Sequence, residues 1–151
     1  GDVMHVASLL RLQGYEKVIL EAGLEINSEL VKEGSFDYKK ALKCSQELLS
    51  LPESKRPTAI FCSNDEMAAA TMMVASKMGF SVPDQVAIAG FDDSFISKVL
   101  WPQLTSVAQP FSKMALEAMQ QLNNFPKELE FDPIVRVLPH KLHVRESSIL
   151  T

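Results

Sequence analysis

The chain has 151 residues, of which 46% are hydrophobic and 23% charged, and its formal net charge at pH 7 is −4. This profile is typical of one globular domain whose core needs no disulfide or metal. A pI near 5.4 gives the chain no general attraction for nucleic-acid phosphates, and no apolar run approaches the roughly 20 residues of a membrane span.

The first half of the chain predicts two helices separated by a polar stretch. Apolar spacing indicates a helix over residues 6–23 that ends at Gly23, and a second over residues 35–50 that Pro52 closes. A short strand is expected between them, around residues 30–32. The helical stripes are Leu12, Tyr15, Val18, Ile19 and Ala22, followed by Tyr38, Ala41, Leu42, Ser45 and Leu49.

The second half alternates strands with helices. The predicted elements are a strand at 58–62, a helix at 64–79, a strand at 85–91, a helix at 110–122 and an extended tail at 134–147. Continuous apolar strands that each precede a helix imply a parallel sheet with helices on both faces. The predicted fold class is therefore α/β, with one domain over residues 1–151.

Polar side chains follow two of the predicted strands, at 63–66 and at Asp92-Asp93. In an open α/β sheet, ligands bind outside the carboxyl ends of the strands. Ser63 and Glu66 fit a helix capping box, and either aspartate can cap the next turn. Capping leaves Asn64 and Asp92 for a ligand. An amide and a carboxylate together suit a molecule rich in hydroxyl groups.

Several longer motifs resemble the LacI/GalR family of bacterial transcription regulators, in their sugar-sensing core. They are the Asn-Asp pair before an Ala/Met-rich helix, "MGFSVPDQVAIAGFDD", "WPQLTSVAQP", "RLQGY" near the start and "VRES" near the end. The resemblance covers nearly the whole chain. It departs from the family at Ser63, where alanine is usual, and at Thr105-Ser106, where two threonines are usual.

The resemblance implies a type I periplasmic-binding-protein fold, with two α/β lobes and a sugar or nucleobase between them. This chain corresponds to the C-terminal lobe, and residues 110–125 would cross to the other lobe. The DNA-binding domain and most of the N-terminal lobe would lie before Gly1. The implied partners are a sugar-like effector, a second copy of the chain and an operator DNA bound through the domain outside it.

The same resemblance assigns five residues to the effector site. Arg11 would bind effector hydroxyls or acid groups, Phe36 would stack on the effector ring, and Asn64 and Asp92 would bind hydroxyls. Phe111 would line the floor of the cleft. Three of these residues also have a structural explanation that needs no ligand. Phe36 and Phe111 can pack in a core, and Arg11 can be a solvated helix residue.

The helix after Asn64 carries two apolar stripes. The first consists of Met67, Ala70, Thr71, Val74 and Met78. The second consists of Ala69, Met72 and Met73. A helix that is apolar on two sides is usually covered on both. We therefore expect the second stripe to form a homodimer interface, to which the resemblance adds Val99 and Leu100.

The helix at 110–122 also has a regular apolar stripe. It consists of Phe111, Met114, Ala118, Met119 and Leu122. Such a stripe is not typical of a solvent-facing helix. Without the other lobe, we expect the stripe to be covered by another copy of the chain or docked on its own sheet.

Other chemistry is weakly indicated. His140 and His143 have helical metal spacing, but Pro139 and the extended pattern argue against a metal site. No nucleotide-binding or nucleophile motif appears, and adjacent strand aspartates point to opposite faces, so we expect neither an enzyme nor a cofactor. Cys44 and Cys62 are expected as buried free thiols, which favours the cytoplasm.

Two functional classes remain open. One is the effector-sensing lobe of a cytoplasmic repressor or activator, and the other is a periplasmic sugar-binding protein that feeds a transporter. The "WPQLTSVAQP" and "VRES" motifs favour the regulator. The chain begins Gly-Asp rather than with Met, so we expect a fragment or a processed chain, and a missing leader decides nothing.

Overall fold

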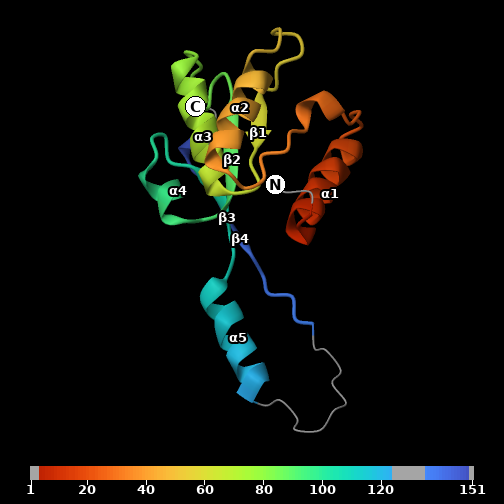
Figure 1. Ribbon diagram of the computed structural model, residues 1–151, viewed down its shortest axis with the longest axis vertical. Helices are drawn as coiled ribbons and strands as arrows, with labels where there is room; N and C mark the ends of the chain where they lie inside the picture. Colours follow the sequence, from red (N-terminus) through yellow and green to blue (C-terminus); the bar gives the residue numbers. More distant parts are fainter. Residues whose placement is uncertain (1–3, 124–134, 150–151) are drawn as a thin grey trace.

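The computed structural model describes residues 4–123 and 135–149. Helices and a four-stranded sheet form a body, from which one helix, α5, projects (Figure 1). In chain order the elements are α1 (Val6–Glu21), η1 (Ser28–Leu30), α2 (Tyr38–Leu49), β1 (Ala59–Phe61), α3 (Asp65–Lys77), β2 (Ala87–Asp92), α4 (Phe95–Val99), β3 (Thr105–Ala108), α5 (Phe111–Asn123), β4 (Lys141–His143) and η2 (Glu146–Ser148).

The strands lie in the order β1-β2-β3-β4. β1, β2 and β3 are parallel, whereas β4 returns antiparallel to β3. The predicted α/β class with a parallel sheet is confirmed, and the tail adds an antiparallel edge strand. We call the end where β1, β2 and β3 finish the carboxyl edge. Because β1 and β2 are neighbours, their terminal polar residues meet at this edge.

The core lies between the sheet and the helices α2 and α3. Ile60 of β1 and Ile88 of β2 are register partners and are buried on the face that these helices cover. The opposite face has less cover, since Phe61 remains 43% exposed there. The α2 and α3 stripes are largely buried as predicted, although Tyr38 and Met78 lie at the outer ends of their stripes and are exposed.

The helix ends follow local chemistry. Gly23 follows Ala22, the C-cap of α1, and has φ of +71°; its N–H donates to the Leu20 carbonyl, which confirms the predicted stop. The strand predicted at 30–32 is wrong. The Asn27 side chain accepts a hydrogen bond from the Glu29 N–H and caps the short helix η1 there, and the segment pairs with no strand of the described sheet.

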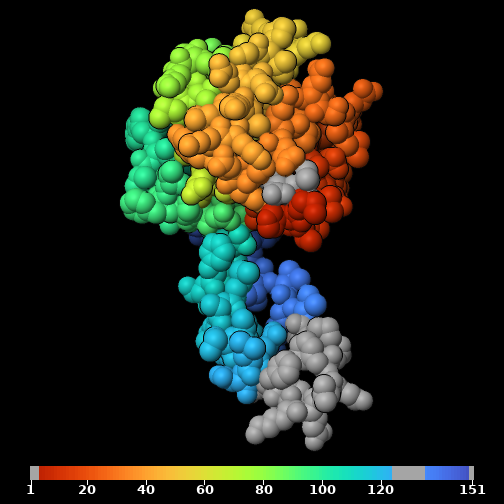
Figure 2. All heavy atoms as spheres, in the orientation of Figure 1, coloured from red at the N-terminus to blue at the C-terminus, as the bar shows by residue number. Residues whose placement is uncertain are grey.

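Helix α5 leaves the body at the end of β3 and projects into solvent (Figure 2). The four large apolar side chains of its predicted stripe, Phe111, Met114, Met119 and Leu122, remain 54%, 43%, 55% and 64% exposed. The expectation that the helix docks on its own sheet is therefore wrong. Cover from a second copy or from another lobe remains a prediction.

Within residues 4–123 and 135–149, no helix is both long and apolar enough to span a membrane. The same residues contain no cluster of three or more histidine, cysteine or acidic side chains arranged to hold a metal ion. Cys62 is buried, as predicted, whereas Cys44 is only partly buried; both are free thiols.

Candidate functional site

Arg11 of α1 is the centre of a cluster at the carboxyl edge. Its guanidinium carbon lies 3.8 Å from the centroid of the Phe91 ring and 5.7 Å from that of Phe36. Its Nη1 donates to the Ser63 carbonyl at 2.6 Å, and its Nη2 lies 4.0 Å from Oδ1 of Asp92. Three of the predicted site residues, Arg11, Phe36 and Asp92, are thus brought together.

Two of these residues have a strained backbone. Four described non-glycine residues have positive φ, at +48° and +54° for Ser35 and Phe36, and at +104° and +49° for Asp92 and Asp93. The left-handed region is costly for residues with a Cβ, and such strain is concentrated at functional sites. Each strained pair contains one residue that the sequence assigns to the site.

Asp92 is the last residue of β2, and its carboxylate faces two donors. Gln109 Nε2 donates to Oδ1 at 2.7 Å, and Arg11 approaches the same oxygen. Burial raises the pKa of Asp92, the Gln109 hydrogen bond and the Arg11 charge lower it, and the nearby Asp65 charge raises it, so that the pKa lies above its ordinary value. Burial likewise lowers the pKa of Arg11, against the effect of Asp92.

Two hollows flank this cluster. One of about 360 Å³ lies between α1 and β1 and has Arg11 and Ser63 in its lining. The other, of about 630 Å³, lies between the carboxyl edge, α5 and the returning chain, with Phe91 and Gln109 in its lining. Asp92 is not in the lining of either hollow, but its carboxylate contacts one lining residue of each, Arg11 and Gln109.

Asn64 has a different role from the one predicted. Its Oδ1 accepts the Met67 N–H at 2.9 Å, so Asn64 itself is the N-cap of α3, and the Ser63–Glu66 capping box is wrong. The cap lies one residue later than expected because α3 begins at Asp65. The oxygen of Asn64 is committed to the helix, and its amide nitrogen is the end that a ligand can use.

Phe111 lies apart from the Arg11 cluster. It begins α5, is 54% exposed, and is linked to the site residues through its backbone, whose N–H donates to the Gln109 carbonyl at 2.9 Å. Any part that Phe111 takes in binding depends on what covers α5.

A second polar cluster, which the sequence did not reveal, lies behind Asp92. Asp65 is only 1% exposed, and its Oδ2 accepts hydrogen bonds from the Ser94 N–H and hydroxyl, while its Oδ1 accepts one from the Ser106 hydroxyl. A Cβ at Gly90 would lie 2.4 Å from Oδ1 of Asp65, so only glycine allows this approach.

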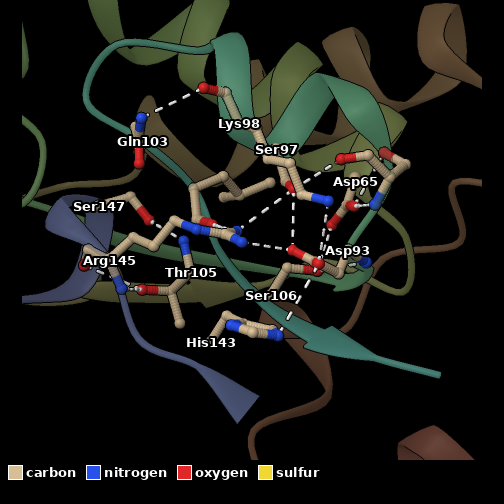
Figure 3. A network of polar contacts seen from close by, with 12 residues as sticks. Asp65, Asp93, Ser97, Lys98, Gln103, Thr105, Ser106, His143, Arg145 and Ser147 are labelled. Carbon is tan, nitrogen blue, oxygen red and sulfur yellow. Dashed lines mark hydrogen bonds and ion pairs between the residues drawn. The ribbon is translucent and has the colours of Figure 1, made fainter. Parts of the chain in front are cut away.

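Asp93 belongs to this second cluster, where its carboxylate meets the Arg145 guanidinium (Figure 3). Arg145 Nη2 lies 2.5 Å from its Oδ1, and Lys98 Nζ and His143 Nε2 lie 3.3 Å and 3.9 Å from its Oδ2. Burial raises the pKa of Asp93. The hydrogen bonds and charges of Arg145 and Lys98 outweigh burial, so the pKa lies below its ordinary value. The side chains of Asp92 and Asp93 therefore lie in different environments, in agreement with the prediction that they point to opposite faces.

The predicted dimer residues are not equally available. Ala69 and Met72 are 5% and 6% exposed and pack inside their own chain, so within the predicted interface stripe Met73, 47% exposed, offers the accessible surface. The cause is that α3 is covered by α2, by β2 and in part by α4. Met73 and Val99 are exposed and Leu100 is partly buried. Phe95 and Trp101, 79% and 86% exposed, extend the apolar surface beyond the predicted residues.

Comparison with known proteins identifies the family to which this fold belongs. Residues 3–148 match the family model of the periplasmic binding protein-like domain. The chain belongs to this family. Its relatives include transcription regulators, among them a sugar-binding regulator of the LacI family from Escherichia coli, as the motifs indicated.

Three of these relatives give the scale of the likeness. Catabolite control protein A of Priestia megaterium is 33% identical over 91% of this chain and 41% of its own length. The HTH-type transcriptional repressor PurR of Aliivibrio fischeri (strain MJ11) is 37% identical over 81% of this chain and 36% of its own. A solved complex of the transcriptional regulator CelR with cellobiose has a TM-score of 0.83 and 34% identity, over 98% of this chain and 45% of that one. The chain thus spans less than half the length of these relatives.

Proposed function

We propose that this chain is the effector-sensing lobe of a LacI-type transcription regulator whose effector is a sugar or a similar polyol. The observation that carries the proposal is the Arg11–Asp92 pair at the carboxyl edge, whose arginine lies over two phenylalanine rings. This edge is where open α/β sheets bind ligands. The cellobiose complex of the similar regulator CelR supports a sugar.

Each side chain suits one part of such a ligand. The Asp92 carboxylate accepts hydrogen bonds from neighbouring hydroxyls, and the Arg11 guanidinium and the Asn64 amide nitrogen donate to them. The Phe36 ring packs against the apolar face of a sugar ring. Phe111 closes the floor of the site once the cleft is complete.

The whole protein would act in the cytoplasm as a homodimer and reach its operator through a DNA-binding domain outside this chain. The acidic composition of this chain agrees with DNA binding by a different domain. The named relatives are regulators, which favours this function over the periplasmic sugar-binding protein of a transporter.

The test is calorimetry on the full-length protein with cellobiose, sucrose and glucose, comparing the unchanged protein with Asp92→Ala. Loss of a charged hydrogen-bond partner costs about 2–3 kcal/mol, or roughly 30- to 150-fold in affinity. Lys17→Ala, an exposed change on α1 away from the cluster, serves as the control. An affinity that survives Asp92→Ala unchanged would remove Asp92 from the site.

A further inference from the structure

We infer that Gln109 is a positioning residue of the proposed site: its side chain holds the Asp92 carboxylate in place, and its backbone starts the arm that carries α5. The inference rests on the proposed function and deepens it. Gln109 itself needs no contact with the ligand for this role.

The sheet register creates the contact. Asp92 and Ala108 are register partners at the ends of β2 and β3, so Gln109 is the first residue past the carboxyl edge beside Asp92. Its Nε2 donates to Oδ1 of Asp92 at 2.7 Å. Arg11 approaches this same oxygen, so among the described contacts Oδ2 is the oxygen that remains for a ligand hydroxyl.

The carboxylate needs such support because its backbone is strained and its surroundings are only partly solvated. The turn at Asp92 and Asp93, with φ of +104° and +49°, is held from behind by the hydrogen bond from the Asp93 N–H to the Ser106 hydroxyl at 3.0 Å. On the other side of the turn, the Gln109 side chain donates a hydrogen bond to the Asp92 carboxylate. The charged groups that act on Asp92 from the packed elements are Arg11 of α1 and Asp65 of α3, which have opposite effects on its ionisation.

Gln109 also belongs to the start of α5. Its carbonyl accepts the Phe111 N–H at 2.9 Å, and the carbonyl of Pro110 accepts the Met114 N–H at 2.9 Å. The side chain of Gln109 thus contacts the candidate site while its backbone contacts the first residue of α5. A ligand that moves the Asp92 carboxylate acts directly on the residue from which this helix departs.

The first experiment needs no ligand. The carboxyl carbon of Asp92 is titrated by NMR in this chain, in Gln109→Leu and in Gln103→Leu, whose side chain contacts the Lys98 carbonyl outside the site. Removing the Gln109 hydrogen bond takes away an interaction that favours the charged form, so we expect the pKa of Asp92 to rise in Gln109→Leu only. An Asp92 titration that is the same in all three proteins overturns the inference.

The second experiment uses the full-length protein and the sugar that binds in the calorimetric panel. Gln109→Leu should weaken binding about 10-fold at neutral pH. Its loss of affinity on acidification should also begin at a higher pH than in the unchanged protein, a shift that a merely structural defect would not produce. If the unchanged protein binds no sugar of the panel, the proposed function fails, whereas normal binding by Asp92→Ala removes only Asp92 from the site. The NMR titration decides the Gln109 contact in either case. A pH profile that does not move in Gln109→Leu contradicts the positioning role.

Discussion

Arg145 and Asp93 are 52 residues apart in the sequence, and their side chains meet with Nη2 and Oδ1 at 2.5 Å. Both side chains are largely buried, at 14% and 12% exposure. The same guanidinium donates to the Leu104 carbonyl (Figure 3). Arg145, which follows β4, thus contacts both Asp93 at the end of β2 and Leu104 at the start of β3. These contacts hold the three strands together next to the candidate site.

Replacing Arg145 with methionine should destabilise the chain by about 3 kcal/mol, because Asp93 would lose its closest partner while remaining mostly buried. Lys98 and His143 stay near the carboxylate and limit the loss. Urea denaturation gives the free energy of unfolding. Lys17→Ala, which removes an exposed pair with Glu21, is the matched control and should change it by less than about 0.5 kcal/mol. Equal midpoints for the two variants would show that the buried pair contributes nothing.

Asp93 also predicts how stability depends on pH. Its pKa is lowered in the fold, so its contribution is complete above the unfolded-state pKa of about 3.9 and is lost as the pH falls through the lower folded value. The stability difference between the unchanged chain and Arg145→Met should hence be constant near neutral pH and shrink below about pH 4. Denaturation curves at a series of pH values measure this. A difference that grows on acidification would have the wrong sign.

Asp92 should affect the pH dependence of stability in the opposite direction to Asp93. Its pKa is raised in the fold, so its charged form costs stability above the folded pKa, and that cost is relieved as the pH falls through the raised value. We expect Asp92→Asn to be slightly more stable than the unchanged chain at neutral pH, by about 0.5–1 kcal/mol, while binding the effector more weakly. Chemical denaturation beside calorimetry separates the two effects. A variant that loses stability and keeps affinity would contradict both assignments.

The parts that follow local rules could be predicted from the sequence. The stop at Gly23 and the α3 stripe depend on residues within one helix, and Asp92 was found because it follows an apolar strand. Asp65 could not be recognised in this way. Its partners Ser94 and Ser106 lie 29 and 41 residues further along the chain, and only the folded sheet brings them to its carboxylate.

The errors have equally specific causes. The apolar residues at 30–32 have strand character, but a strand also needs a pairing partner, and this segment follows a short helix capped by Asn27. The capping assignment failed by one residue, since Ser63 and Asn64 are both good caps and only the geometry selects Asn64. The second stripe of α3 predicts an interface, but an apolar pattern does not say whether the cover comes from the same chain or from another.

The corrected interface leads to a different pair of variants. Met72→Glu would place an unpaired charge in the core and should destabilise the chain by about 3–5 kcal/mol. Val99→Glu, at a 57% exposed position of α4, should leave stability within about 0.5 kcal/mol and yet yield monomers of the full-length protein. Light scattering together with urea denaturation tells the two apart. Dimers that persist in Val99→Glu would move the interface away from α4.

The exposed stripe of α5 makes the last prediction. Met119 and Leu122 are 55% and 64% exposed, so changing either to lysine should alter the unfolding free energy of this chain by less than about 0.5 kcal/mol. In the full-length protein, where we expect the other lobe to cover α5, each change should cost about 1.5–3 kcal/mol.

Gln120→Lys, an exposed polar position on the same helix, is the control and should be neutral in both proteins. Urea denaturation of the three variants in the two lengths gives the six differences. Sedimentation velocity adds a check, because lysine on an uncovered apolar stripe should also reduce self-association of the short chain. If Leu122→Lys costs the same small amount in both proteins, α5 has no partner in the second lobe. If it strongly destabilises the short chain at concentrations where that chain is monomeric, the helix is covered within its own lobe. Either result would contradict the assignment of α5 as the crossing helix.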